Sequence, residues 1–222
     1  MEDFATRLVT AISVLLIGGY FIGLSMNRRV GRGLARWVRD GLRVAGGEGT
    51  IRWLGSSGFV IDVRGLAPPL TRLTVTALLE PREVPPLWLY WRLRGRRDLL
   101  VVRCWFVRRP RRSLEIAAPA SFIGRTALAA VPAEQGWTVR QLDDFVVAAP
   151  ADGAPLGDEL WKVFRAHTAG LWQISVRNQD PHLQVSLSPQ ADSDARAVWR
   201  RLIDAALLIG GRGAGPEGGQ GS

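Results

Sequence analysis

The strongest pattern in the chain is an uninterrupted apolar run near its N-terminus. Residues 8–26 are LVTAISVLLIGGYFIGLSM and contain no charged side chain. As a helix rising 1.5 Å per residue, the run would be about 28 Å long, close to the roughly 30 Å hydrocarbon core of a bilayer. In lipid a lone segment can satisfy its backbone hydrogen bonds only as a helix. The pattern therefore predicts one membrane-spanning helix over 8–26.

The charges on either side of this run predict its orientation. Residues 1–7 hold Glu2, Asp3 and Arg7, whereas the segment after the run holds Asp40 and six arginines: Arg28, Arg29, Arg32, Arg36, Arg39 and Arg43. Basic residues close to a span stay on the cytoplasmic side. We therefore expect residues 1–7 to be external and the rest of the chain, from residue 27, to be cytoplasmic. A cleaved signal peptide is the alternative, but it would need a basic leading flank and a small-residue cleavage site.

The segment after the run predicts a basic amphipathic helix within residues 27–45. Apolar residues recur at helical spacing on one face and arginines on another: Val30, Leu34, Trp37, Val38 and Leu42, against Arg32, Arg36, Arg39 and Arg43. Two interpretations are open. The helix could lie on anionic headgroups with Trp37 as an interfacial anchor, or it could be a linker helix packed on the following domain.

Short apolar runs separated by turn residues predict strands in the first half of the remaining chain. A hairpin is expected from 50–54 and 59–63 and another from 87–94 and 99–108, each across a glycine-containing turn. Single strands are expected at 73–79, 114–117 and 145–149, and a short helix at 123–131.

The second half has a clearer pattern. A helix is expected at 157–170, with His167 at the edge of the core, and another at 193–209, capped by Ser193. Between them, 172–176 and 183–187 alternate apolar and polar residues on both sides of a turn, which predicts an antiparallel hairpin. The fold class is therefore α+β, a mainly antiparallel sheet with helices on one face. We expect the domain to span 46–209 and the glycine-rich tail, 210–222, to be disordered.

Gly19 and Gly23 form a GxxxG pattern inside the predicted span. Two small residues one turn apart allow a second helix to approach closely. Glycine is also common in spans that have no such partner, so helix–helix packing at this pair is a hypothesis.

The composition and the motifs limit the kinds of chemical site that the chain can form. Cys104 is the only cysteine, which excludes an intramolecular disulfide and a zinc site built on cysteines. No nucleophile elbow, dinucleotide fingerprint or phosphate loop is present, and the two histidines have no metal-ligand spacing. We expect no cofactor, no metal, no small-molecule substrate and no enzymatic activity.

The formal charge is +9, and 28 of the 29 basic residues are arginines. The densest basic segment is 92–112, where aromatic residues lie among nine arginines and Asp98 is the only acid: Arg92, Arg94, Arg96, Arg97, Arg103, Arg108, Arg109, Arg111 and Arg112. Such a segment could bind RNA phosphates, with bases stacked on the aromatic rings. It could equally bind anionic lipid headgroups, or form a solvated sheet edge protected from strand addition.

The order of these features resembles the calumin family. The matches are a span ending in 20–23 (YFIG), an arginine-lined helix, the segment 97–100 (RDLL), and a helix running into a strand over 161–176. The family consists of endoplasmic-reticulum membrane proteins that work with an intramembrane chaperone at ribosome-bound translocons. The acidic region and the long coiled coil of that family have no counterpart in these 222 residues. The resemblance therefore implies no calcium buffering. A compact, arginine-rich chain of this kind is typical of a prokaryotic relative in the plasma membrane.

Together these patterns predict a single-span protein whose cytoplasmic domain binds rather than catalyses. The first hypothesis is an accessory role in membrane-protein insertion or assembly, with translocon, insertase or ribosome components as partners. A membrane scaffold or sensor that binds anionic headgroups is the second hypothesis. A membrane-tethered hydrolase is the third, and it would require a deep polar pocket.

Overall fold

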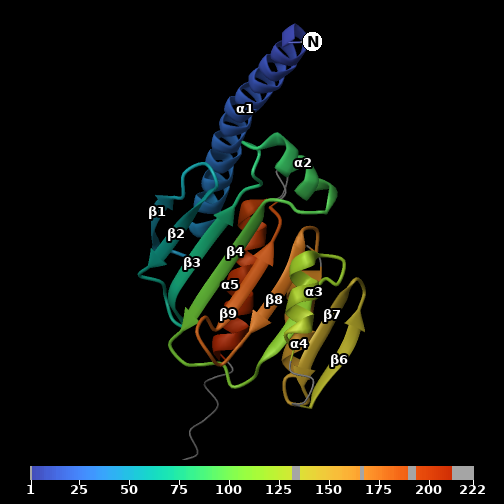
Figure 1. Ribbon diagram of the computed structural model, residues 1–222. Coiled ribbons are helices and arrows are strands. Elements are labelled where there is room, and N and C mark those ends of the chain that lie inside the picture. Colours follow the sequence, from blue (N-terminus) through green and yellow to red (C-terminus); the bar gives the residue numbers. More distant parts are fainter. Residues whose placement is uncertain (1, 132–135, 166–167, 190–193, 212–222) are drawn as a thin grey trace, which may run out of the picture.

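The computed structural model describes residues 2–131, 136–165, 168–189 and 194–211. Within these residues the strands form one antiparallel sheet in the order β1-β2-β3-β4-β9-β8-β5-β7-β6 (Figure 1). Their bounds are Glu48–Trp53 (β1), Gly58–Arg64 (β2), Leu70–Leu78 (β3), Leu99–Phe106 (β4), Leu114–Ala117 (β5), Trp137–Leu142 (β6), Phe145–Pro150 (β7), Leu171–Val176 (β8) and Leu183–Leu187 (β9).

Two of the predicted hairpins are confirmed by the register. β1 pairs with β2 so that Ile51 faces Ile61, and β8 pairs with β9 so that Ile174 faces Val185. β9 also pairs with β4, which joins the two halves of the sheet into one surface. The predicted α+β fold is therefore confirmed.

The helices are α1 (Glu2–Leu42), α2 (Pro85–Leu93), α3 (Phe122–Ala129), α4 (Ala154–Phe164) and α5 (Ala195–Gly211). The C-terminal half of α1, together with α4 and α5, covers the apolar face of the sheet, and α3 lies over the opposite face beside β5 and β8 (Figure 1). Trp199 of α5 is fully buried, and a Cβ at Gly41 would lie only 1.7 Å from its ring. α1 and α5 can therefore pack in contact only because position 41 has no side chain.

α1 is one continuous helix of 41 residues, about 60 Å long at 1.5 Å per residue. Its N-terminal half projects beyond the domain (Figure 1), and its apolar side chains from Phe4 to Met26 are mostly exposed. The described residues hold one helix that is long and apolar enough to cross a membrane.

The basic amphipathic helix is the C-terminal part of α1 and not a separate element. Leu34, Val38 and Leu42 are buried in the domain core, and Trp37 is half-buried against it. The apolar face is thus used by the domain, as the second interpretation stated. Trp37 packs partly against the core, and its role as an interfacial anchor, which the first interpretation gave it, stays a prediction.

The predicted strand at 87–94 is wrong, because this segment forms α2. Pro85 and Pro86 occupy the first turn of a helix, where the missing N–H costs nothing. No edge is free for a strand there, because β3 pairs directly with β4, with Thr76 opposite Val101. The hairpin expected between 87–94 and 99–108 therefore does not form, although β4 does.

Smaller differences concern the second half of the chain. β6 was not expected, and α4 lies at Ala154–Phe164, earlier than the predicted 157–170. On β8 and β9 the polar partners of the alternation are buried as well: Gln173, Ser175 and Ser186. His167, Ser193 and residues 212–222 of the predicted tail lie outside the described residues.

Candidate membrane-surface site

The basic segment 92–112 is not one surface. Arg92 and Arg94 lie at the end of α2 and Arg96 and Arg97 directly after it, and α2 lies at the end of the sheet from which α1 projects (Figure 1). The second group follows β4 at the opposite end of the sheet: Arg108, Arg109, Arg111 and Arg112. The eight residues of β4 separate the two groups by roughly 26 Å, at about 3.3 Å per residue. The basic segment therefore forms two separate groups of arginines.

Another arginine surface, separate from both groups of segment 92–112, lies on α1 and includes most of the basic residues predicted there. A groove of about 490 Å³ lies between α1 and β1, lined by Arg29, Arg32, Ala35, Arg36, Arg39, Ile51 and Trp53. The arginines follow one another at spacings of three and four residues, which places them on one side of the helix. We call this groove, with its four arginines, the arginine groove. Arg28 is exposed on α1 but is not part of its lining.

The charges of the arginine groove are not neutralised within the described part of the chain. None of its four arginines forms an ion pair with a described carboxylate. Arg32 and Arg36 each donate only Nε, to the carbonyl oxygens of Arg28 and Arg32, at 3.2 and 3.4 Å. Their terminal guanidinium nitrogens remain available to an anion. Like charges at this spacing repel each other, so an anion in the groove would relieve that repulsion.

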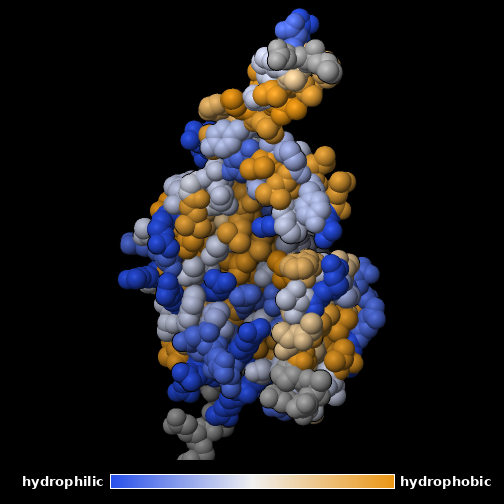
Figure 2. Space-filling model, viewed as in Figure 1, coloured by the Kyte–Doolittle hydropathy of each residue, from blue (hydrophilic) through white to orange (hydrophobic). Residues whose placement is uncertain are grey.

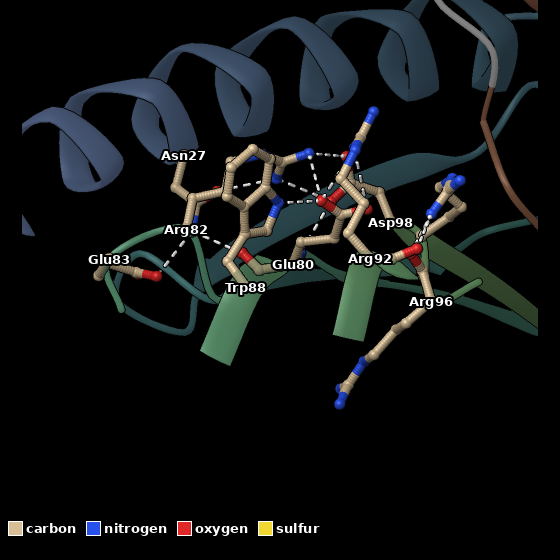
Figure 3. Close-up of polar contacts among 9 residues, drawn as sticks. Asn27, Glu80, Arg82, Glu83, Trp88, Arg92, Arg96 and Asp98 are labelled. Carbon is tan, nitrogen blue, oxygen red and sulfur yellow. Dashed lines mark hydrogen bonds and ion pairs between the residues drawn. The ribbon is translucent and has the colours of Figure 1, made fainter. Parts of the chain in front are cut away.

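Below the apolar run, α1 is joined to the loop before α2 by a network of polar side chains (Figure 3). Arg82 donates two hydrogen bonds to Asp98, at 2.8 and 2.9 Å, and one to Oδ1 of Asn27, at 2.9 Å. Asn27 in turn donates to the carbonyl oxygen of Glu80 at 2.9 Å. The Arg82 and Asp98 side chains are only 10% and 16% exposed. This bidentate pair is therefore protected from solvent and joins the segments before and after α2, while Asn27 links them to α1.

Glu80 joins the same network to α2. Its side chain is 2% exposed, accepts a hydrogen bond from Nε1 of Trp88 at 2.5 Å and lies 3.3 Å from Nη1 of Arg92. Trp88 and Arg92 are one helical turn apart, so both hold the same side of α2 against the domain (Figure 3).

Glu83 lies in the same loop and accepts hydrogen bonds from α1 and from the turn between β1 and β2. Burial opposes its ionisation, but hydrogen bonds from Ser56, from its own backbone and from Asn27 outweigh that cost and lower its pKa below the ordinary value of 4.5. Glu83 is therefore a carboxylate that ties the β1–β2 turn to α1.

Gly19 and Gly23 contact this loop of their own chain. A Cβ at Gly19 would lie 2.7 Å from Cγ of Pro85, and one at Gly23 would lie 1.9 Å from the carbonyl oxygen of Arg82. The small residues of the GxxxG pattern thus admit the first residue of α2 and the loop before it, both from the same chain.

Sequence reasoning missed the network of Asn27, Glu80, Arg82 and Asp98. Its members are up to 71 residues apart, and their individual types are ordinary for surface loops. One signal was present: Asn27 is the first residue after the apolar run, where a polar side chain in a helix needs a partner if it is buried.

No family model and no curated protein matches the chain. Among solved structures, the crystal structure of the mycobacterial trehalose monomycolate transport factor A, TtfA, is similar with a TM-score of 0.42 and 13% sequence identity. The match covers 81% of this chain and 94% of that chain. A likeness of this size assigns neither a family nor a function, and the resemblance to the calumin family stays a prediction.

Proposed function

We propose that the protein is a single-span membrane protein whose domain binds anionic headgroups in the arginine groove and performs no catalysis. The observation that carries this proposal is the position of the groove on α1. The helix that holds the apolar run continues without a break into the helix that holds the four arginines. The distance of each arginine from the membrane is therefore set by the helix itself.

The helical rise gives that distance. Arg29 and Arg32 lie three and six residues beyond Met26, or about 4.5 and 9 Å along the helix axis. The headgroup layer on each side of the hydrocarbon core is about 5–7 Å thick. The backbone of Arg29 is thus within the headgroup layer, and that of Arg32 lies just beyond it, close enough for its long side chain to extend back to the phosphates. Arg36 and Arg39 extend the groove away from them. Ile51 and Trp53 provide an apolar wall opposite the cations.

The orientation follows from the same residues. Arginines close to a span favour the cytoplasmic side, so we place the domain in the cytoplasm and residues 1–7 outside, with the plasma membrane as the location.

The proposal can be tested by lipid binding to the full-length protein in a neutral detergent. Dioctanoyl phosphatidylglycerol is titrated in parallel with dioctanoyl phosphatidylcholine, into the wild type and into Arg29→Gln/Arg32→Gln. Each arginine near a phosphate contributes about 1 kcal/mol, so the double variant should bind phosphatidylglycerol roughly 30-fold more weakly. Binding to phosphatidylcholine should be weaker throughout and should change little.

Arg108→Gln/Arg109→Gln is the matched control, since it removes the same charge from the opposite end of the sheet. It should bind phosphatidylglycerol like the wild type. Equal losses in the two double variants would mean that net charge decides binding, and an unaffected groove variant would exclude the groove as the site.

The role in membrane-protein insertion or assembly stays a prediction that rests on the family resemblance. Sedimentation of the same variants with purified ribosomes separates it from lipid binding. Ribosome binding that depends on Arg108 and Arg109 but not on Arg29 and Arg32 would favour the assembly role over the headgroup site.

A further inference from the structure

α2 is exposed to an unusual degree for a helix made of apolar residues. Its sequence is PPLWLYWRL, and none of its residues is buried. The apolar side chains that point outward are Leu87, Leu89, Tyr90 and Leu93, at 41%, 53%, 47% and 79% exposure, with Val84 before the helix at 48%. Figure 2 shows hydrophobic residues over α2 as well as over the projecting part of α1. Leaving this apolar surface in water would be unfavourable.

The start of α2 lies beside the apolar run and not beyond it. Pro85 packs against Gly19, and Gly19 precedes Met26 by seven residues, which corresponds to about 10 Å along the helix. The charged network of Arg82, Asp98 and Asn27 lies level with the end of the run. If residues 8–26 span the bilayer, the first turn of α2 is therefore at the depth of the acyl chains.

The polar and aromatic groups of α2 fit the boundary between acyl chains and headgroups. Three of its aromatic rings each lie under a guanidinium group. The distance from the guanidinium carbon to the ring centre is 5.5 Å for Arg92 and Trp88, 4.7 Å for Arg94 and Tyr90, and 5.2 Å for Arg96 and Trp91. Tryptophan and tyrosine concentrate at membrane interfaces because their rings are apolar and their N–H or O–H groups are polar. Arginines at the end of the helix can extend to headgroup phosphates.

α2 is also held rigidly enough to keep its position. Its inner side is fixed by the hydrogen bond from Trp88 to Glu80 and by the ion pair of Arg92 with Glu80. These contacts leave the leucine side free. The network thus fixes the side of α2 that faces the protein and, with it, the side that faces outward.

From this arrangement we propose that α2 is an interfacial membrane helix, which inserts Leu89, Tyr90 and Leu93 into the same leaflet from which α1 emerges. The occupant of its apolar side is the lipid bilayer, because that side continues the apolar surface of α1. The domain then contacts the membrane through two elements at an angle, so its tilt relative to the bilayer is fixed. This inference rests on α1 being a span, but it does not require an anion in the arginine groove.

Spin labelling of the full chain in nanodiscs of phosphatidylcholine and phosphatidylglycerol tests the inference. Cysteine is introduced by Leu93→Cys, with Leu15→Cys in the apolar run as the lipid reference and Val107→Cys at the far end of the sheet as the water reference. Positions 15 and 107 are 73% and 63% exposed, so all three labels have room. The native Cys104 is buried and should not be labelled. Each label is then relaxed by molecular oxygen, which concentrates in lipid, or by a neutral nickel chelate, which stays in water.

The label at position 93 should respond to oxygen several-fold more than to the nickel chelate, like the label at 15 and unlike the label at 107. A label at 93 that behaves like the one at 107, while the one at 15 stays in lipid, would overturn the inference and leave the anchor intact. A label at 15 exposed to the nickel chelate would overturn the span and with it both proposals. A label at 93 shielded from both reagents would mean that protein covers α2, which also overturns the inference.

Discussion

Gly23 of α1 packs directly against the backbone carbonyl of Arg82, so closely that a Cβ at position 23 would lie 1.9 Å from that oxygen. This contact joins the apolar half of α1 to the loop that begins α2. Together with Gly41 against Trp199, it holds α1 to the domain at two points 18 residues apart. The domain is therefore fixed in height and rotation relative to the projecting helix.

Gly23→Ala should destabilise this junction. A methyl group cannot fit 1.9 Å from a backbone oxygen, so the loop must move away from α1. Overpacking of this kind costs about 1–3 kcal/mol. We expect a lower melting temperature in detergent and faster hydrogen exchange in α2.

Gly18→Ala is the control for this variant, because nothing lies within 4 Å of a Cβ at position 18. Alanine is the better helix former by up to about 1 kcal/mol, so Gly18→Ala should be neutral or slightly stabilising. Equal effects of the two substitutions would show that Gly23 contributes helix propensity and not close packing.

The parts of the fold that the sequence predicted are those with a local periodic signal. The hairpins at β1–β2 and β8–β9 have alternating residues around a turn, and α5 has a clear apolar stripe. α2 was mistaken for a strand because Trp88, Tyr90 and Trp91 favour strands and the helix is only nine residues long. What decides its state is tertiary: β3 already pairs with β4, so no strand position is left.

The candidate site, too, could be predicted from the sequence only in its local features. The arginines of α1 could be predicted, since helical spacing alone places Arg29, Arg32, Arg36 and Arg39 on one side. The groove could not, because its other wall is β1, and the packing of β1 against α1 is not encoded in local spacing. The division of the basic segment also depends on topology, since the length of β4 separates Arg97 from Arg108 only once the strand is extended.

Arg82→Met should cost far more stability than its counterpart on the surface. The Arg82–Asp98 pair is nearly buried, and removing one partner of such a pair leaves a carboxylate without its cation, at a cost of about 3–5 kcal/mol. Arg72→Met breaks a pair of similar length, Arg72–Asp62, whose side chains are 49% and 35% exposed, and should cost less than about 1 kcal/mol. Urea unfolding in detergent measures both. Similar costs would show that solvent reaches the Arg82 network.

Acid should weaken the contact made by Glu83. The folded protein holds the pKa of Glu83 below its ordinary value of 4.5, so its stabilising contribution is complete above about pH 4.5 and is lost as the pH falls through the folded value. Glu83→Gln cannot titrate. The difference in unfolding free energy between wild type and Glu83→Gln should therefore be constant near neutral pH and should change below pH 4.5.

Ser56→Ala refines this pH experiment, because Ser56 donates the hydrogen bond to Glu83 that contributes most to lowering its pKa. The acid-induced loss of stability should be smaller in this variant than in the wild type. Identical pH profiles for all three proteins would exclude Glu83 as the group that titrates.

Cys104 should be unreactive in the folded protein. Its side chain lies in β4 at 2% exposure, and burial raises the pKa of the thiol to about 12, so the thiolate is almost absent at pH 8. A maleimide should modify the native protein far more slowly than the protein in concentrated urea, and the native rate should follow the rate of opening of the sheet. The Val107→Cys variant provides the comparison within one chain, since its exposed thiol at the far end of the sheet should react at once while Cys104 does not. Two thiols modified at equal rates under native conditions would show that the centre of the sheet, where β4 joins β9, opens readily.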